Sequence, residues 1–319
     1  MKKTAIKIFS STQILIFLDD FSRELFKPSN FNTTTASNNQ KIKPIKENIF
    51  EFLENRKSKI FSSFLLEPLK GELNYFDRII FTVAESLRRA GREIFSVNEL
   101  YKLLGGNARS LGNSLREEIS ESLEKMACTR FRITMTEINR RNKYSDNLEV
   151  DFKSTVLPTK SVTLKRNGKI CDGVFQFLDN SPLFQSIELR KQLTACSADL
   201  LQVPRLRSTR QTIMIKFYLL ERVVGSIGSH KEHKQHFIGK TADGVKFKTV
   251  KPQTKIIKLE TLLQVCELSD ANKWQFQDVR NTIEKTLNHF KNQGLITDWN
   301  FTIKDKKIYS VQFDFMKKT

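Results

Sequence analysis

The fold is decided by residues 258–313, which read KLETLLQVCELSDANKWQFQDVRNTIEKTLNHFKNQGLITDWNFTIKDKKIYSVQF. The stretch opens with an apolar segment around Leu262 that predicts a short helix, and Ser269 is a good N-cap residue for a longer one. The apolar positions of the longer helix recur at helical spacing: Val279, Ile283, Leu287 and Phe290. Gly294 is a typical residue to end it, so the pattern predicts a short helix followed by a long amphipathic one.

A basic β-hairpin follows the long helix. Residues 299–304 and 307–313 have the composition of strands, and Asp305-Lys306 lies at the turn. Helices followed by such a hairpin are the plan of a winged helix, in which the long helix reads base edges and the hairpin lies against phosphates. The residues expected to contact double-stranded DNA are Lys273, Gln277, Arg280 and Asn281 on the helix and Lys304, Lys306 and Lys307 on the hairpin. The same polar face also suits a helix that is only solvated.

The charge of the chain indicates a polyanionic partner. The 319 residues include 54 Lys or Arg against 35 Asp or Glu, a formal net charge of +19, and the pI is about 9.8. Nucleic acid is the first candidate and an acidic membrane surface the second. Residues 183–319 hold 24 Lys or Arg against 13 Asp or Glu, so the basic excess lies mainly with the predicted winged helix.

A second unit of the same plan is predicted upstream. Residues 75–90 form an amphipathic helix that stops at Gly91, residues 94–95 a short strand, and Ser96 with Glu99 a capping box that opens a short helix. A third helix covers residues 111–126, and strands at 130–136 and 148–152 flank a basic turn. The residues expected to contact DNA here are Asn107, Arg109, Asn113 and Arg116 at the start of the third helix and Arg140, Arg141 and Lys143 in the turn.

The predicted fold class is α+β, with tandem winged-helix domains behind a flexible N-terminal leader. Residues 1–70 are expected to form the leader and a docking helix, and residues 71–182 the N-terminal winged helix with a trailing hairpin turned at Asn167-Gly168. Residues 183–319 form the C-terminal winged helix, whose first helix is capped by Ser208. A basic insertion at 226–255 interrupts this second copy.

The chain offers little for catalysis or metal binding. His230, His233 and His236 are spaced by three, but lysines surround them and no Cys or carboxylate completes a ligand set. Gly239-Lys240-Thr241 resembles the end of a P-loop without the first glycine or a preceding apolar strand. The four cysteines lie far apart and form no CxxC pair, so neither a zinc ribbon nor a disulfide framework is indicated. We therefore expect no enzyme, no metal, no cofactor, no cleaved signal and no membrane span.

Several segments resemble the iteron-binding plasmid replication initiator proteins, in particular those called replication initiator protein A. The segments are NYFDR at 74–78, FSVNELY at 95–101, LGGN at 104–107, Pro158, Asn167-Gly168 and YLLER at 218–222, and the resemblance covers residues 71–313. It implies a bacterial cytoplasmic protein whose C-terminal winged helix reads repeated origin sites. The N-terminal winged helix would add DNA contacts or mediate dimerisation, in a monomer–dimer equilibrium, and host replication proteins would be partners.

Three functions remain open from the sequence. The first is sequence-specific initiation of plasmid or phage-like replication without catalysis. The second is a winged-helix transcriptional repressor, for which a single palindrome rather than tandem direct repeats is expected beside the gene. The third is a basic nucleic-acid-binding protein without site specificity, which predicts steep salt dependence and no preferred sequence.

Overall fold

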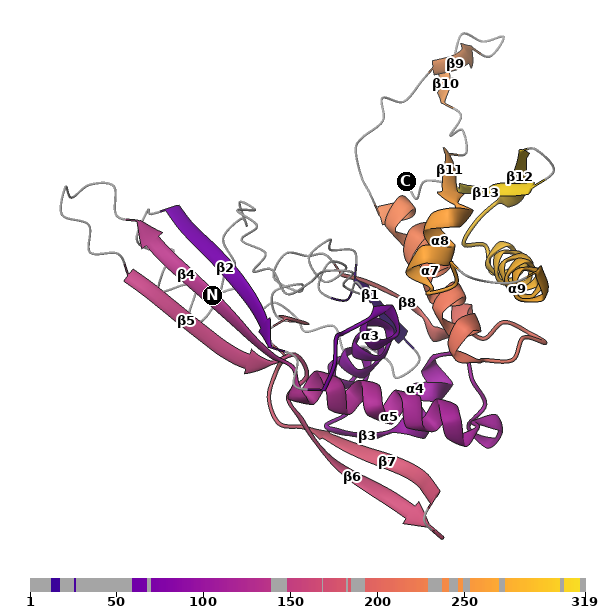
Figure 1. Cartoon of the computed structure of the whole chain (residues 1–319). Helices are drawn as coiled ribbons and strands as arrows, with labels where there is room; N and C mark the ends of the chain where they lie inside the picture. The colour runs from indigo at the N-terminus through magenta and orange to yellow at the C-terminus, as the bar shows by residue number, and fades with distance from the viewer. Residues whose placement is uncertain are drawn as a thin grey trace. The chain divides into compact units, whose positions relative to one another are not determined.

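The computed structural model describes residues 13–17, 26, 59–67, 70–138, 148–167, 169–181, 183–184, 193–228, 237–240, 246–248, 253–269, 273–304 and 307–315 (Figure 1). Helices and strands are mixed, as expected for an α+β protein. The chain divides into two compact units. The first comprises Met1–Lys102 and Asn107–Ala195, and the second comprises Leu103–Gly106 and Cys196–Thr319.

The first unit is built on α3 (Tyr75–Arg89), which is buried along most of its length. Asn74 caps it in a capping box with Asp77, an interaction in which each side chain accepts a hydrogen bond from the other residue's backbone N–H. The predicted capping box of Ser96 and Glu99 is confirmed, with distances of 2.8 and 3.2 Å from backbone nitrogen to side-chain oxygen. It joins β3 (Ile94–Ser96) to α4 (Val97–Leu103), and the short helix η1 (Ala108–Ser110) and α5 (Asn113–Cys128) follow.

Two strands occupy the region expected to be a leader with a docking helix. β1 (Gln13–Phe17) is buried from Ile14 onwards, pairs with β8 (Leu193–Ser197), and sets the ring of Phe17 5.7 Å from that of Phe81. β2 (Lys59–Glu67) is a strand where part of a helix was expected, because all nine of its residues pair with β4 (Arg130–Ile138). Residues 59–67, within the region expected to hold the docking helix, are therefore a strand, and residues 48–58 lie outside the described residues.

The first unit has two three-stranded sheets, and their strand pairing differs from the pairing expected from the sequence. Residues 130–152 were expected to complete the upstream winged helix, but β4 and β5 (Leu148–Thr155) form a separate sheet with β2. The hairpin that pairs with β3 is the next one, β6 (Thr159–Arg166) with β7 (Lys169–Phe177). Phe95 of β3 stacks on Phe175 of β7 at 5.7 Å, which favours this pairing. The compact part of the unit thus runs helix, strand, helix, helix, strand, strand.

The second unit repeats that order. The elements in this order are α7 (Arg210–Gly228), β11 (Gln253–Lys258), α8 (Leu259–Val265), α9 (Lys273–Asn292), β12 (Asp298–Lys304) and β13 (Lys307–Phe315), with the sheet order β11-β13-β12. Inside the expected insertion, β9 (Phe237–Lys240) pairs with β10 (Lys246–Lys248). The interruption is shorter than 226–255, because α7 continues to Gly228 and β11 begins at Gln253.

A buried polar cluster fixes the start of α7 inside the second unit. Lys216 is 1% exposed, and its Nζ donates to the carbonyls of Leu104 and Leu201 and to Oγ of Ser208 at 2.8–3.0 Å. Ser208 donates in turn to the carbonyl of Gly105, at 2.8 Å. The expectation that Ser208 caps α7 was therefore wrong, since Thr209 accepts the N–H of Thr212 instead.

Only glycine fits at position 105, whose carbonyl accepts a hydrogen bond in this cluster. Its φ is +79°, and a Cβ there would lie 1.9 Å from the carbonyl oxygen of Leu201. Any other residue would combine a left-handed backbone with a backbone clash. The residues Leu103–Gly106 are thereby held within the second unit.

Candidate nucleic-acid interface

The outward face of α9 carries uncharged amide side chains. Gln277, Asn281 and Asn288 are exposed, whereas the opposite face, with Ile283 and Leu287, is completely buried. Gln277 and Asn281 make no hydrogen bond to another residue of the described ranges. Their amides are therefore available to a ligand, and Asn and Gln are the side chains that pair bidentately with adenine.

Arg280 is exposed but engaged within its own unit. Its Nε donates to Oε1 of Glu284 at 2.9 Å, and its guanidinium carbon lies 5.7 Å from the centre of the Phe301 ring. The ring belongs to β12, so the guanidinium group of Arg280 lies between α9 and the hairpin. Lys273 begins α9, but its side chain is not among those described.

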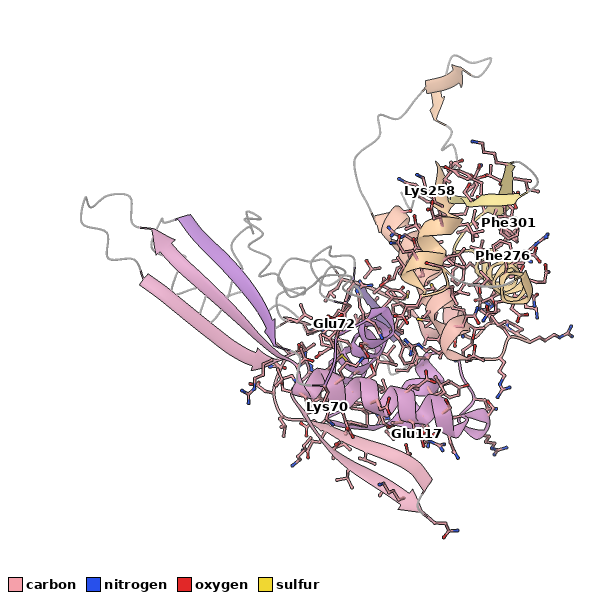
Figure 2. All side chains as sticks on the ribbon, in the orientation of Figure 1. Lys70, Glu72, Glu117, Lys258, Phe276 and Phe301 are labelled. Atoms are coloured by element: carbon pink, nitrogen blue, oxygen red, sulfur yellow. The ribbon has the colours of Figure 1, made fainter. Side chains whose placement is uncertain are left out.

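The C-terminal half of α9 is tied to β12. Trp299 Nε1 donates to the side-chain oxygen of Asn288 at 2.9 Å, and Lys291 makes an ion pair with Asp298 at 2.8 Å. The hydrogen bond from Lys291 lowers the pKa of Asp298. Phe276 on α9 and Phe301 on β12 mark the two elements in Figure 2. Helix and hairpin therefore present one continuous surface of the second unit.

Both hairpins end in a pair of directly opposed basic residues. In the second unit Lys304 lies opposite Lys307, and in the first Arg166 lies opposite Lys169. Each pair closely follows a bulge in the ladder, and two residues separate its members along the chain. Opposed like charges destabilise a hairpin, and a bound anion would relieve that repulsion. The shared arrangement therefore favours phosphate contacts at both tips.

Arg166 and Lys169 were not among the residues predicted from the sequence to contact DNA. Basic residues on both sides of the Asn167-Gly168 turn were the available signal, and Asn167 does adopt a positive φ of 51°. Arg140, Arg141 and Lys143 lie between β4 and β5, and Lys306 lies between β12 and β13, all outside the described residues. Lys304 is exposed, and the Lys307 side chain is not described.

The start of α5 offers less than was expected. The side-chain oxygen of Asn107 accepts the N–H of Arg109 at 3.0 Å and so caps η1. Arg116 is half-buried, with its Nη atoms 3.4 and 3.5 Å from the side-chain oxygens of Asn113 and Asn98. Arg109 and Asn113 are exposed, but Glu117, labelled in Figure 2, is exposed one turn further along the helix. The structure thus leaves α5 with a weak and partly acidic surface for DNA.

Groups for other chemistry are sparse. Within the described ranges, no three His, Cys, Asp or Glu side chains gather as metal ligands, and no helix combines the length and apolar character needed to cross a bilayer. His230, His233 and His236 lie outside those ranges, as does Thr241. Gly239 and Lys240 belong to strand β9 rather than to a loop at the start of a helix.

Solved protein structures include distant neighbours of this chain. No protein-family model matches the sequence, and no curated protein matches it. The crystal structure of RctB domains 2-3 is similar with 12% sequence identity and a TM-score of 0.43, covering 81% of this chain and 88% of that chain. The crystal structure of selenomethionine derivatives of the same two RctB domains is similar with 12% identity and a TM-score of 0.38, covering 82% and 88%.

Proposed function

We propose that this chain is a non-catalytic, sequence-specific double-stranded DNA-binding protein that initiates replication of a plasmid or phage-like DNA at repeated origin sites. The observation that carries the proposal is the exposed amide stripe of α9 beside a hairpin with an opposed basic tip, in a chain of net charge +19. Amides supply direct base readout and the lysines supply sequence-independent affinity. Both are needed for a protein that marks one site among many.

The proposal treats both units as winged helices. Each has the element order helix, strand, helix, helix, strand, strand, and in each the first strand pairs with the last. In this arrangement α9 would enter a major groove, while β12–β13 and β6–β7 would lie against the backbone. Arg280 would have to exchange Glu284 for a base or phosphate on binding.

Double-stranded DNA fits this surface better than RNA. The reading face is a helix of twenty residues, and the deep, narrow major groove of A-form RNA does not admit side chains for base readout. Two half-buried aromatics of the neighbouring hairpin strand, Trp299 and Phe301, are held edge-to-face at 5.3 Å and engaged by Asn288 and Arg280. They are therefore not free platforms for stacking single-stranded bases.

The initiation role is supported by the resemblance of residues 71–313 to iteron-binding plasmid initiators. With it come a bacterial cytoplasmic location, a monomer–dimer equilibrium and recruitment of host replication proteins. A repressor would use the same surface, so the arrangement of the target sites separates the two roles.

Selection of bound sequences from a random double-stranded pool tests the proposal, using the full chain at about 150 mM salt, where non-specific binding is weakened. We expect one motif, present as tandem direct repeats beside the gene, and replication of a reporter plasmid that carries those repeats. Recovery of a single palindrome without plasmid replication would indicate the repressor. Recovery of no motif would overturn sequence-specific binding altogether.

A further inference from the structure

The tip of the second hairpin exposes two large apolar side chains among its lysines. Ile303 is 67% exposed, more than any other large apolar residue of the described ranges, and Tyr309 is 48% exposed. Ile303 comes directly after the bulge of the β12–β13 ladder, where Tyr309 of β13 has no partner on β12, and lies opposite Ile308. A bulge redirects the side chains beyond it, so the outward position of Ile303 belongs to the local backbone geometry.

Charges enclose this apolar tip. Lys304 follows Ile303 directly and lies opposite Lys307, and its Nζ is 6.0 Å from the centre of the Tyr309 ring. Lysines on an edge strand oppose pairing with a second copy of the same strand, and β12 is at the edge of its sheet. A partner for this tip must therefore be anionic outside and apolar within, which describes phosphates flanking the base stack of duplex DNA.

We propose that Ile303 is a wedge that enters the minor groove and partly unstacks a base step. Lys304 and Lys307 would hold the phosphates on either side, and the ring of Tyr309 would pack against the sugars. The inference rests on the proposed function and adds to it a deformation of the DNA. Side chains used as wedges elsewhere are large and apolar, and flexible pyrimidine–purine steps such as TA are the least costly to unstack.

The chain contains a matched control for this residue. Ile256 is 62% exposed and lies on β11 of the same sheet, opposite Gln312 and therefore away from the tip. Replacing either isoleucine by alanine removes the same atoms from a similarly exposed site. Only the change at Ile303 should alter the DNA.

The test uses a 30-base-pair duplex with central TA steps in which 2-aminopurine replaces one adenine. Fluorescence anisotropy of an end label measures affinity at about 50 mM salt, and 2-aminopurine emission measures unstacking. We expect the wild-type chain to raise the emission, Ile303→Ala to remove most of the rise with an affinity within about threefold, and Ile256→Ala to behave as wild type. Ile303→Phe, which keeps a large apolar group, should restore the rise.

Equal emission with wild type and Ile303→Ala, or no rise for wild type on a duplex that it binds, would overturn the wedge and leave the proposed function standing. A change in oligomeric state caused by Ile303→Ala would assign the tip to contacts between copies and also overturn the wedge. Failure of the wild-type chain to bind the duplex at all would overturn the proposed function, and the wedge with it.

Discussion

The third helices of the two units, α5 and α9, occupy the same place in the same element order but present opposite charges. α9 carries four basic and two acidic residues, and α5 carries two basic and four acidic ones. On α9 the exposed stripe is made of amides, whereas on α5 Glu117 and Glu121 are exposed. The surface of the helix, rather than its place in the fold, therefore decides whether it can approach DNA.

The polar residues near the start of α5 and α9 also differ, in whether other residues of the chain already engage their side chains. Asn107 and Arg116 of the first unit are used for a cap and for contacts with neighbouring amides, while Gln277 of the second unit has no described partner. The first unit retains an opposed basic pair on its hairpin, Arg166 and Lys169. Under the proposed function, the second unit would read bases and the first unit would contribute phosphate contacts through β6–β7.

The largest expected effect comes from removing the amides of α9. Each bidentate amide–base pair is worth about 1–3 kcal/mol, so the double variant Gln277→Ala/Asn281→Ala should lose roughly 2–6 kcal/mol on the selected site. Binding to a scrambled duplex, which depends on the lysines, should change little. Competition titrations on both duplexes at one salt concentration measure the two affinities.

Asn113→Ala on α5 is the matched control for that double variant. It removes an exposed amide from the start of the equivalent helix, and we expect a loss of less than about 0.5 kcal/mol on either duplex. An equal loss from both helices would contradict the division of roles between the units. An equal loss of the double variant on both duplexes would show that α9 does not read bases.

The first helices of the two units show a second contrast, in how they bury charge. On α3 the buried Asp77 is paired with Lys125 at 2.8 Å. On α7 the buried Lys216 has only neutral acceptors, and burial lowers its pKa to about 7. Three acceptors match the three N–H groups of an ammonium, so deprotonation removes one donor from the cluster.

Lys216 should therefore make the stability of the second unit depend on pH. Burial lowers its pKa from the ordinary value of 10.5 to about 7 on folding, so between these values the unfolded chain binds a proton that the folded chain does not. Stability should rise with pH in that window, by at most about 1.4 kcal/mol per pH unit, or roughly 2 kcal/mol from pH 7.5 to 9.5. Below pH 7 both states are protonated and the dependence ends.

Urea unfolding followed by tryptophan fluorescence measures this effect, because Trp274 and Trp299 are the two tryptophans of the chain and both belong to the second unit. The reference is Lys216→Met, which keeps the chain length without the charge. The difference in unfolding free energy between wild type and variant should increase with pH. A difference that stays constant would mean that the three acceptors keep Lys216 charged throughout.

The parts of the fold that could be predicted are those with local signals. Helical spacing predicts α3 and α9, the Ser96–Glu99 capping box is confirmed, and Asn167-Gly168 predicts the β6–β7 hairpin. β11 was missed because an edge strand with two isoleucines among lysines has no clear alternation. β1 and β2 were missed because their partners, β8 and β4, lie far along the chain.

The candidate site likewise has features that local sequence signals predict and features that depend on pairings between distant segments. The exposed face of α9 follows from helical spacing, and the Arg280–Glu284 pair follows from their separation of four residues. The contact of Arg280 with Phe301 and the role of β6–β7 depend on pairings between distant segments. β3 pairs with β7 some eighty residues later, and no local pattern distinguishes that partner from the nearer β4–β5 hairpin.

The smallest expected effect comes from removing one basic residue at the tip of each hairpin. Lys304→Ala and Arg166→Ala each remove one phosphate contact, so each should weaken binding to every duplex by about 1 kcal/mol and lower the slope of log affinity against log salt by about 1. Lys160→Ala is the control, since Lys160 is exposed on β6 but lies opposite Gln176, away from the tip. Equal changes of this slope for Lys304→Ala and Arg166→Ala would indicate that the hairpins of both units contact the DNA backbone. A change at Lys304 with none at Arg166 would leave the second unit as the sole source of contacts, and the opposed basic pair of β6–β7 would then need another anion as its partner.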